Sequence, residues 1–278
     1  MAAPFGVSDD GPVAPHTNPD PDARRDHGAD ADELASLRRG RRISVCIPAR
    51  DEAATVGTIV DAIVRELTEE GGGAPLVYDV VVADDGSTDE TGELARAAGA
   101  RVVTRSSGAG GKGQAMRSAL EAASGDLIVF LDADVTNFGP HFVTGLLGPL
   151  LADDSLALVK GYYERPLHGA PGGGGRVTEL VARPLIDLLF PHLAVVKQPL
   201  AGETAAPRSV LEKCGLADGY AVELALLIDV AARFGTEAIA QVDLGIREHR
   251  NRPLEELRPQ ATDVLRAALA RAPRDPEG

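Results

Sequence analysis

Short runs of β-branched and other apolar residues alternate with longer mixed stretches through the first half of the chain. The apolar runs predict strands at about residues 43–48, 78–83, 101–103 and 126–131. The stretches between them predict helices at about residues 54–69, 89–98 and 113–123. Strands that alternate with helices indicate the α/β class, with a mostly parallel sheet and helices on both of its faces.

The pattern changes after Pro140, which indicates a part of the chain with a different task. Helices are predicted at about residues 141–151, 177–189, 209–213, 221–234 and 253–270, and strands at about 157–163 and 238–243. Residues 1–40 are rich in Ala, Pro, Asp and Gly, so they cannot bury enough surface to offset the entropy lost on ordering. We therefore expect a disordered acidic tail at 1–40, with a short helix at about 32–38, and two halves at 41–140 and 141–278.

Composition restricts the partners of this chain. The formal net charge is −14, from 28 Lys and Arg against 42 Asp and Glu, which argues against binding to a nucleic-acid backbone. No apolar stretch approaches the roughly 18 residues that cross a bilayer, and no secretory pattern opens the sequence. We therefore expect a cytoplasmic protein with no nucleic-acid partner and no membrane partner. The two cysteines, Cys46 and Cys214, are too few for a disulfide framework or a zinc cluster.

Three of the four strands predicted in the first half end in polar sequence, at residues 48–52, 84–87 and 132–134. In an open α/β sheet, ligands bind outside the carboxyl ends of the strands, so these segments should converge on one cleft. Asp132 and Asp134 are separated by one residue and suit a hard divalent cation that is shared with a diphosphate. A lone Asp-Ala-Asp is more often a solvated turn, but the buried strand before it and the two other acidic strand ends favour a metal site.

Asp85 and Lys112 are further candidates in the first half. Asp85 fits a tight turn or a helix cap, and its carboxylate also suits hydrogen bonds from the base or ribose of a nucleotide. Lys112 opens a predicted helix, where its ammonium group and the free backbone N–H groups can face an anion. The glycine spacing before Lys112 is wrong for a Walker P-loop. A solvated surface lysine remains the alternative.

The second half offers three more candidates. Gly175 and Arg176 stand at a helix start, where a fixed positive charge and free amides favour a carboxylate or phosphate. Glu223 lies near the start of an apolar helix. His249 is surrounded by cations, which oppose its protonation and leave a neutral imidazole suited to a metal.

These features together resemble the GT-A fold glycosyltransferases, and more narrowly the glucosyl-3-phosphoglycerate synthases and their mannosyl counterparts. The resemblance covers about residues 43–257. Besides Asp132-Ala133-Asp134, it rests on four segments: GGGGRVTELVARPL at 172–185, QPL at 198–200, GYAVE at 219–223 and AIAQVDLGIREHRNRPL at 238–254. A match in five separated segments is specific. It implies a Rossmann-like, mostly parallel sheet, with the nucleotide sugar bound by residues 41–140 and the acceptor by residues 141–278.

The resemblance also implies a role for each candidate residue. Asp134 and His249 would bind Mg²⁺ or Mn²⁺ together with the diphosphate, and Glu223 would hold hydroxyls of the donor sugar, so these three form the expected catalytic set. The remaining donor contacts would be Pro48, Ala49, Glu52, Asp85, Lys112, Asp132 and Ala133. The acceptor contacts would be Gly175, Arg176, Thr178 and Asn251.

The function implied is a retaining, metal-dependent transfer of a hexose, glucose from UDP-glucose, onto a small anionic acceptor. That acceptor would be 3-phosphoglycerate or an intermediate of a specialised pathway, and we expect the enzyme to be a homodimer. One alternative is an inverting GT-A transferase that builds a polysaccharide or glycolipid, with Glu223 as its base. A nucleotidyltransferase is disfavoured because residues 48–52 lack its glycines, and a non-catalytic nucleotide-binding protein is the last alternative.

Overall fold

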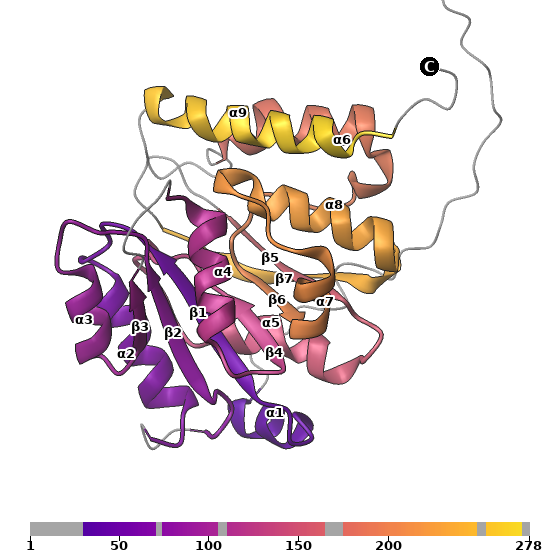
Figure 1. Ribbon diagram of the computed structural model, residues 1–278. Coiled ribbons are helices and arrows are strands. Elements are labelled where there is room, and N and C mark those ends of the chain that lie inside the picture. The colour runs from indigo at the N-terminus through magenta and orange to yellow at the C-terminus, as the bar shows by residue number, and fades with distance from the viewer. Residues whose placement is uncertain (1–29, 71–73, 105–109, 165–174, 249–253, 274–278) are drawn as a thin grey trace, which may run out of the picture.

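The computed structural model describes residues 30–70, 74–104, 110–164, 175–248 and 254–273 (Figure 1). Its strands form one seven-stranded sheet in the order β3-β2-β1-β4-β6-β5-β7. The strands are β1 (Ile43–Ala49), β2 (Asp79–Asp84), β3 (Arg101–Thr104), β4 (Leu127–Phe130), β5 (Leu158–Glu164), β6 (Thr204–Pro207) and β7 (Ile239–Ile246).

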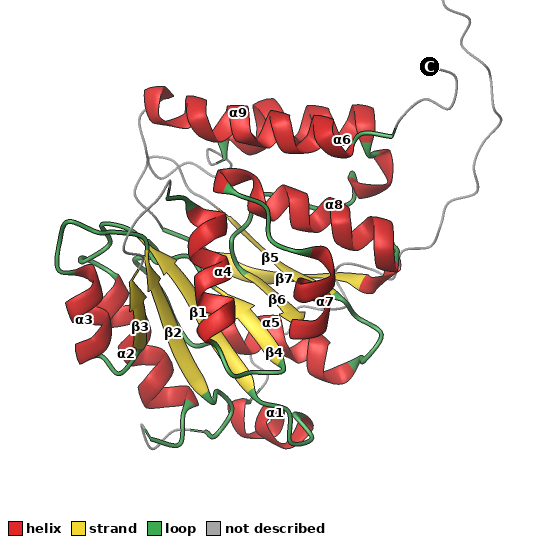
Figure 2. Ribbon diagram, in the orientation of Figure 1, coloured by secondary structure: helices red, strands yellow, loops and turns green. Residues whose placement is uncertain are grey.

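Helices cover both faces of this sheet (Figure 2). They are α1 (Ala31–Leu37), α2 (Val56–Leu67), α3 (Thr91–Ala97), α4 (Lys112–Ala122), α5 (His141–Ala152), α6 (Arg183–Leu189), α7 (Arg208–Cys214), α8 (Val222–Phe234) and α9 (Leu254–Arg271). A π-helical segment, η2 (Thr178–Ala182), leads directly into α6. Short 3-10 turns are η3 (Pro191–Leu193), η4 (Gly219–Ala221) and η5 (Thr236–Ala238). All the predicted helices and strands are confirmed, with bounds that differ by at most three residues.

The sheet is mostly parallel, as predicted. β1 runs parallel to both β2 and β4, β2 runs parallel to β3, and β5 runs parallel to β7. β6 is the exception, since it is inserted between β4 and β5 and runs antiparallel to both. β6 was not predicted from the sequence, because its four residues, Thr-Ala-Ala-Pro, have little of the β-branched or aromatic character that is typical of strands.

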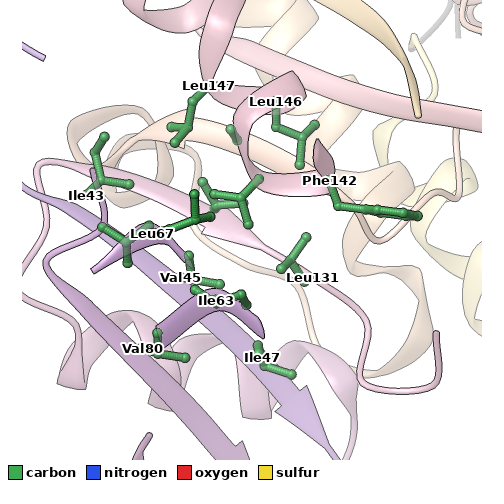
Figure 3. Close-up of a cluster of buried hydrophobic side chains, with 14 of the residues drawn as sticks. Ile43, Val45, Ile47, Ile63, Leu67, Val80, Leu131, Phe142, Leu146 and Leu147 are labelled. Carbon is green, nitrogen blue, oxygen red and sulfur yellow. The ribbon is translucent and has the colours of Figure 1, made fainter. Parts of the chain in front are cut away.

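The two faces of the sheet carry separate hydrophobic cores. Alternate residues of a strand point to opposite faces, so Ile43, Val45 and Ile47 of β1 pack on one side and Cys46 on the other. Figure 3 shows the first core, where these β1 side chains meet Ile63 and Leu67 of α2 and Phe142, Leu146 and Leu147 of α5. The second core packs α4, α7 and α8 on the opposite face. A strand buried on both faces explains why β1 reads as a continuous apolar run.

The first and last described helices pack against the rest of the molecule, one through a buried leucine and the other through an ion pair. The short helix expected at about 32–38 is present as α1, and its Leu34 is buried in the first core. The rest of the expected tail, residues 1–29, lies outside the described residues. At the other end, Arg271 of α9 forms a two-pronged ion pair with Asp229 of α8, with N–O distances of 2.8 Å. In the part of the chain described, no helix is both long and apolar enough to cross a membrane.

The sheet continues across the expected boundary at residue 140. β1 to β4 come from the first half, and β5 to β7 come from the second, with β6 joining the two through its pairing with β4. The two halves therefore share one sheet. Their assignment to donor and acceptor remains a prediction.

Candidate active site

The loops that follow β1 and β2 are hydrogen-bonded to each other. Asp51 Oδ1 accepts from the Thr88 backbone N (2.7 Å), and the Asp51 backbone N donates to Ser87 Oγ (3.0 Å). The Glu52 backbone N donates to Thr91 Oγ1 (2.8 Å). Asp51 adopts φ +54°, a left-handed conformation that is uncommon for residues other than glycine. The first two strand ends therefore converge, as the sequence predicted.

The loop after β4 joins the same edge. Thr55, at the start of α2, donates its hydroxyl to the carbonyl oxygen of Ala133 at 2.5 Å. Ala49 accepts from the backbone N of Asp85 (2.9 Å), while Pro48 before it is half-buried. The predicted donor-binding residues from the ends of β1, β2 and β4 are thus in one place.

Asp85 connects the end of β2 to the start of α4. Its Oδ2 accepts a hydrogen bond from the backbone N of Gly111 at 2.7 Å. A Cβ atom at Gly110 would lie 2.6 Å from the same oxygen, so the loop before α4 approaches Asp85 where only glycine fits. Asp85 therefore holds the loop that carries Lys112. Its predicted contact with a nucleotide remains a prediction.

Lys112 bridges two carboxylates from distant parts of the sequence. Its Nζ lies 2.5 Å from Asp132 Oδ1 and 2.5 Å from Glu223 Oε1. Burial alone would lower the pKa of Lys112, but the charges of Asp132 and Glu223 outweigh it and raise the pKa above its ordinary value. The lysine therefore stays charged. Three residues predicted separately from sequence meet here.

Arg247 binds both aspartates of the Asp132-Ala133-Asp134 segment. Its Nη2 donates to Asp132 Oδ2 at 2.9 Å and to Asp134 Oδ1 at 2.6 Å. Burial would raise the pKa of Asp132, but Lys112 and Arg247 together lower it well below its usual range. Asp132 is therefore an ionised carboxylate held from two sides. Arg247 is a functional candidate that was not predicted from the sequence.

Arg247 also contacts the carboxylate of Glu203. Glu203 is fully buried, and its Oε1 lies 3.3 Å from Arg247 Nη1. The same nitrogen donates to the hydroxyl oxygen of Tyr163 at 2.6 Å. Burial would lower the pKa of Arg247, but Glu203, Tyr163 and the two aspartates raise it well above its ordinary value. Arg247 directly follows the end of β7, so the strand-end rule applied to the second half of the chain would have pointed to it.

The end of β7 is fastened beside the Asp132-Ala133-Asp134 loop. The Thr136 backbone N donates to the carbonyl oxygen of Glu248 at 3.0 Å, and the Glu248 backbone N donates to Asn137 Oδ1 at 2.9 Å. Two other predicted site residues, His249 and Asn251, lie outside the described residues. Glu248, directly before His249 in the sequence, is thus tied to the loop that carries Asp134.

The predicted acceptor residues lie at the start of the helix formed by η2 and α6. Gly175 has φ +85°, a left-handed backbone conformation that glycine adopts easily. Arg176 is exposed, whereas Thr178 is buried as the first residue of η2. Segments of π-helix are rare and occur frequently at functional sites. Arg176 is the charged member of this group, and it lies at the surface.

The chemistry of the donor set fits a divalent cation that also binds a diphosphate. Mg²⁺ is commonly held by one or two carboxylates together with substrate phosphates, and not by an all-protein cage. In the described chain, no group of three or more His, Cys, Asp or Glu side chains is arranged to hold a metal ion. Arg247 donates to Oδ1 of Asp134, so the positive charge at this carboxylate is at present that of the arginine.

Comparison with known proteins identifies the family. The model of Glycosyl transferase family 2 matches residues 44–169. Glucosyl-3-phosphoglycerate synthase of Mycolicibacterium paratuberculosis is 48% identical over 252 residues, which covers 86% of this chain and 75% of the relative. The chain belongs to the glucosyl-3-phosphoglycerate synthase family. It is therefore a glycosyltransferase that depends on a nucleotide sugar, and the predicted fold and enzyme class are confirmed.

Solved structures of this family match along most of the chain. A crystal structure of glucosyl-3-phosphoglycerate synthase from Mycobacterium tuberculosis, in complex with Mn²⁺, UDP-glucose and phosphoglyceric acid, is 45% identical with a TM-score of 0.80. The match covers 89% of this chain and 86% of that one. Another structure of the same enzyme, in complex with Mg²⁺ and UDP, also has a TM-score of 0.80 at 45% identity, covering 90% of this chain and 86% of that chain.

Proposed function

We propose that this chain transfers glucose from UDP-glucose to 3-phosphoglycerate, with retention of the anomeric configuration and with Mg²⁺ or Mn²⁺ as cofactor. One observation carries the proposal: Lys112, Asp132, Asp134, Glu223 and Arg247 form a single charged cluster at the carboxyl edge of the sheet. A family relative has been solved in complex with Mn²⁺, UDP-glucose and phosphoglyceric acid, which supports these substrates.

The donor would lie across the first three strand ends. We assign the uridine to Pro48, Ala49, Glu52 and Asp85, and the diphosphate and sugar to Lys112, Asp132 and Ala133. The hydrogen bonds between the loops after β1 and β2 support this assignment, because they fix the shape of the nucleoside site before the ligand arrives. The charge of Lys112 is available to stabilise the departing diphosphate.

The metal would be held by Asp134 and His249. When bound, it neutralises charge on the diphosphate and makes the nucleotide a better leaving group. Arg247 must then share Asp134 with the cation or withdraw from it, since it donates to Asp134 Oδ1 in this structure. If Arg247 stays near the diphosphate, it adds its positive charge to that of Lys112 beside the leaving group.

Two carboxylates would orient the sugar for a retaining transfer. Glu223 and Asp132 are both ion-paired to Lys112, and carboxylate oxygens accept strong hydrogen bonds from hydroxyl groups such as those of a sugar. The acceptor hydroxyl would attack the anomeric carbon from the face that the diphosphate leaves. The bond between the anomeric carbon and the acceptor oxygen forms as the bond between the anomeric carbon and the β-phosphate oxygen breaks. The departing phosphate oxygen takes the proton of the acceptor hydroxyl.

The acceptor would bind between Arg176, Thr178, Gly175 and Asn251. Arg176 is exposed at a helix start, where a guanidinium group and the positive end of the helix dipole favour a phosphate or carboxylate. This placement favours a small anionic acceptor over the polysaccharide or glycolipid of the inverting alternative.

The direct test is a turnover assay with UDP-glucose and 3-phosphoglycerate in the presence of Mn²⁺ or Mg²⁺. Other nucleotide sugars and other small acids serve as controls, and the anomer of the product is read from NMR coupling constants. We expect an α-linked product and a clear preference for this pair of substrates. A β-linked product would contradict retention, and no turnover with any of the pairs would contradict the assigned reaction.

We also propose that the enzyme is a homodimer that works in the cytoplasm. Large apolar side chains are exposed on neighbouring elements at one end of the molecule, Leu188 of α6 (80% exposed) and Leu269 of α9 (62%) among them. Isolated exposed leucines are ordinary, but a group on adjacent helices is typical of an interface. Light scattering on the purified protein tests the dimer, and Leu188→Lys with Leu269→Lys should yield a monomer.

A further inference from the structure

Lys160 is a lysine in the interior of the sheet that the proposed reaction leaves without a role. It lies in β5 opposite Thr204 of β6, and it is 2% exposed. Its Nζ donates to the carbonyl oxygen of Ala201 at 2.8 Å and to Thr204 Oγ1 at 3.4 Å. Within the described residues, no carboxylate lies at ion-pair distance from this amine. A buried ammonium group held only by neutral acceptors costs free energy, so its presence points to a task.

The acceptors of Lys160 belong to a segment that touches the active site. Residues 201–204 enter β6, and the backbone N of Gly161, next to Lys160, donates to the carbonyl oxygen of Glu203 at 2.9 Å. β5 therefore holds this segment at two carbonyl groups, those of Ala201 and Glu203. The segment cannot shift without breaking hydrogen bonds that are shielded from water.

The backbone of residues 201–204 also lies very close to Asp132, at Gly202. A Cβ atom at Gly202 would lie 2.1 Å from Asp132 Oδ1, so the backbone meets the carboxylate with no room for a side chain. Asp132 is the carboxylate that Lys112 and Arg247 both hold. The position of Gly202 consequently limits the positions that the Asp132 side chain can adopt. Because Lys112 pairs with both Asp132 and Glu223, this also limits the space beside Glu223.

The electrostatic environment links Lys160 to the same cluster. Burial lowers the pKa of Lys160 to about 8, while the charges of Glu223, Glu203 and Asp132 raise it and that of Lys112 lowers it. The charges of the cluster therefore act on this amine, although none of the three carboxylates forms an ion pair with it.

We propose that Lys160 is a positioning residue for the sugar of the donor. It fixes the backbone of Ala201 and Gly202 against Asp132, and in this way it sets the floor of the site that receives the hexose. The inference rests on the proposed function for the identity of that ligand, a nucleoside diphosphate hexose. It predicts that Lys160 affects binding and transfer of the sugar without affecting the uridine, the metal or the acceptor.

The test compares Lys160→Met, which keeps a similar length without a donor, and Lys160→Gln, which keeps a donor on a shorter side chain. Leu158→Met is the matched control, because Leu158 is a buried residue on the same face of the same strand. Titration calorimetry gives the affinities for UDP and for UDP-glucose with Mn²⁺, and steady-state kinetics gives kcat and KM for both substrates.

We expect both Lys160 variants to bind UDP as the wild type does and to keep its KM for 3-phosphoglycerate. Their kcat/KM for UDP-glucose should fall, by about 10- to 100-fold for Lys160→Met and by less for Lys160→Gln, as expected when reacting groups are misplaced. Leu158→Met should resemble the wild type. If Lys160→Met does not fold, Lys160→Gln carries the comparison.

The inference would be overturned if either folded Lys160 variant had the same ratio of UDP-glucose affinity to UDP affinity as the wild type. An equal loss of UDP and UDP-glucose affinity would also overturn it, because it would indicate a general structural role. Failure of the proposed function gives a different result, since the wild type itself would then not turn over UDP-glucose and 3-phosphoglycerate. The affinity ratio can in that case be measured with whichever nucleotide sugar the wild type binds.

Discussion

Nζ of Lys112 lies 2.5 Å from Oε1 of Glu223, which joins the first residue of α4 to the first turn of α8. The two residues are 111 positions apart, and both helices begin at the edge of the sheet where the strand ends converge. Glu223 is buried, so the ion pair is shielded from water. A shielded pair of this kind stabilises the assembled site and is costly to break from one side only.

The coupling between Lys112 and Glu223 should be measurable by a double-mutant cycle. Lys112→Met leaves the buried carboxylate of Glu223 without its cation and Asp132 with Arg247 alone, whereas Glu223→Gln leaves Lys112 with Asp132 alone. We expect the double variant to be more stable than the sum of the single effects predicts, with an interaction energy of about 1–3 kcal/mol from urea unfolding. Strictly additive losses would mean that the pair contributes nothing to stability.

Asp134→Ala should abolish most of the activity, because it removes a proposed ligand of the metal. An uncompensated diphosphate is a poor leaving group, so we expect kcat to fall by about 100-fold or more, and chelation of the metal should have a similar effect on the wild type. Asp154→Ala is the matched control, because Asp154 is an exposed carboxylate paired with Arg39 and Arg41 on the surface. Turnover that survives in Asp134→Ala or in chelator would refute the metal assignment.

Gly113→Ala should be strongly destabilising. A Cβ atom at Gly113 would lie 1.8 Å from the carbonyl oxygen of Ala217, so α4 or the loop before η4 would have to move. We expect a loss of about 1–3 kcal/mol in the free energy of unfolding, as for other overpacked sites, and reduced activity because Lys112 is the preceding residue. Thermal and urea unfolding measure the effect.

Gly57→Ala is the control for that experiment. Gly57 is the second residue of α2, just as Gly113 is the second residue of α4, and its added Cβ would meet Leu94 Cβ at 3.7 Å, an ordinary contact. Alanine in place of glycine at such a helical position stabilises by about 0.4–1 kcal/mol. Equal effects of the two substitutions would contradict the close packing at Ala217.

The sequence predicted the candidate site best where its side chains follow the ends of parallel strands. The position of Asp85, Lys112, Asp132 and Asp134 after strands or at a helix start was sufficient to place them together, since parallel strands bring their carboxyl ends to one edge. The pairing of Glu223 with Lys112 could not be deduced in this way, because it depends on how α8 packs across a shared sheet.

Lys160 and Glu203 could not be predicted from sequence for a related reason. Lys160 stands in an apolar strand, where a charged residue usually points to solvent from an edge, but β5 is covered by β6 on one side and β7 on the other. The insertion of β6, a four-residue strand with weak local preference, is what buries both groups. Long-range pairing therefore decides which charges enter the core.

Lys160 should make the stability of the protein depend on pH above neutrality. Its pKa is about 8 in the folded protein, whereas an unfolded lysine has a pKa of about 10.4. Between these values the unfolded chain binds a proton that the folded protein does not, so the free energy of unfolding rises with pH by at most about 1.4 kcal/mol per unit. The stability difference between the wild type and Lys160→Met should be flat below pH 8 and should shift in favour of the wild type above it. Urea unfolding of both proteins from pH 7 to about pH 9.5 measures this, and a constant difference would contradict the lowered pKa.

Arg176→Ala should affect the acceptor and spare the donor. Arg176 is exposed at the start of the helix that follows Gly175, so its guanidinium group can be removed without disturbing the buried cluster, and in the proposed site this removes the charge assigned to the anionic acceptor. A lost charge-assisted hydrogen bond costs about 1.5–3 kcal/mol, which corresponds to a rise of roughly 10- to 150-fold in the KM for 3-phosphoglycerate. Arg266→Ala on α9 is the control, because Arg266 is also exposed and pairs only with Asp263 among the described residues. Steady-state kinetics with each substrate varied in turn separates the two effects, and an equal rise in both KM values would remove Arg176 from the acceptor site.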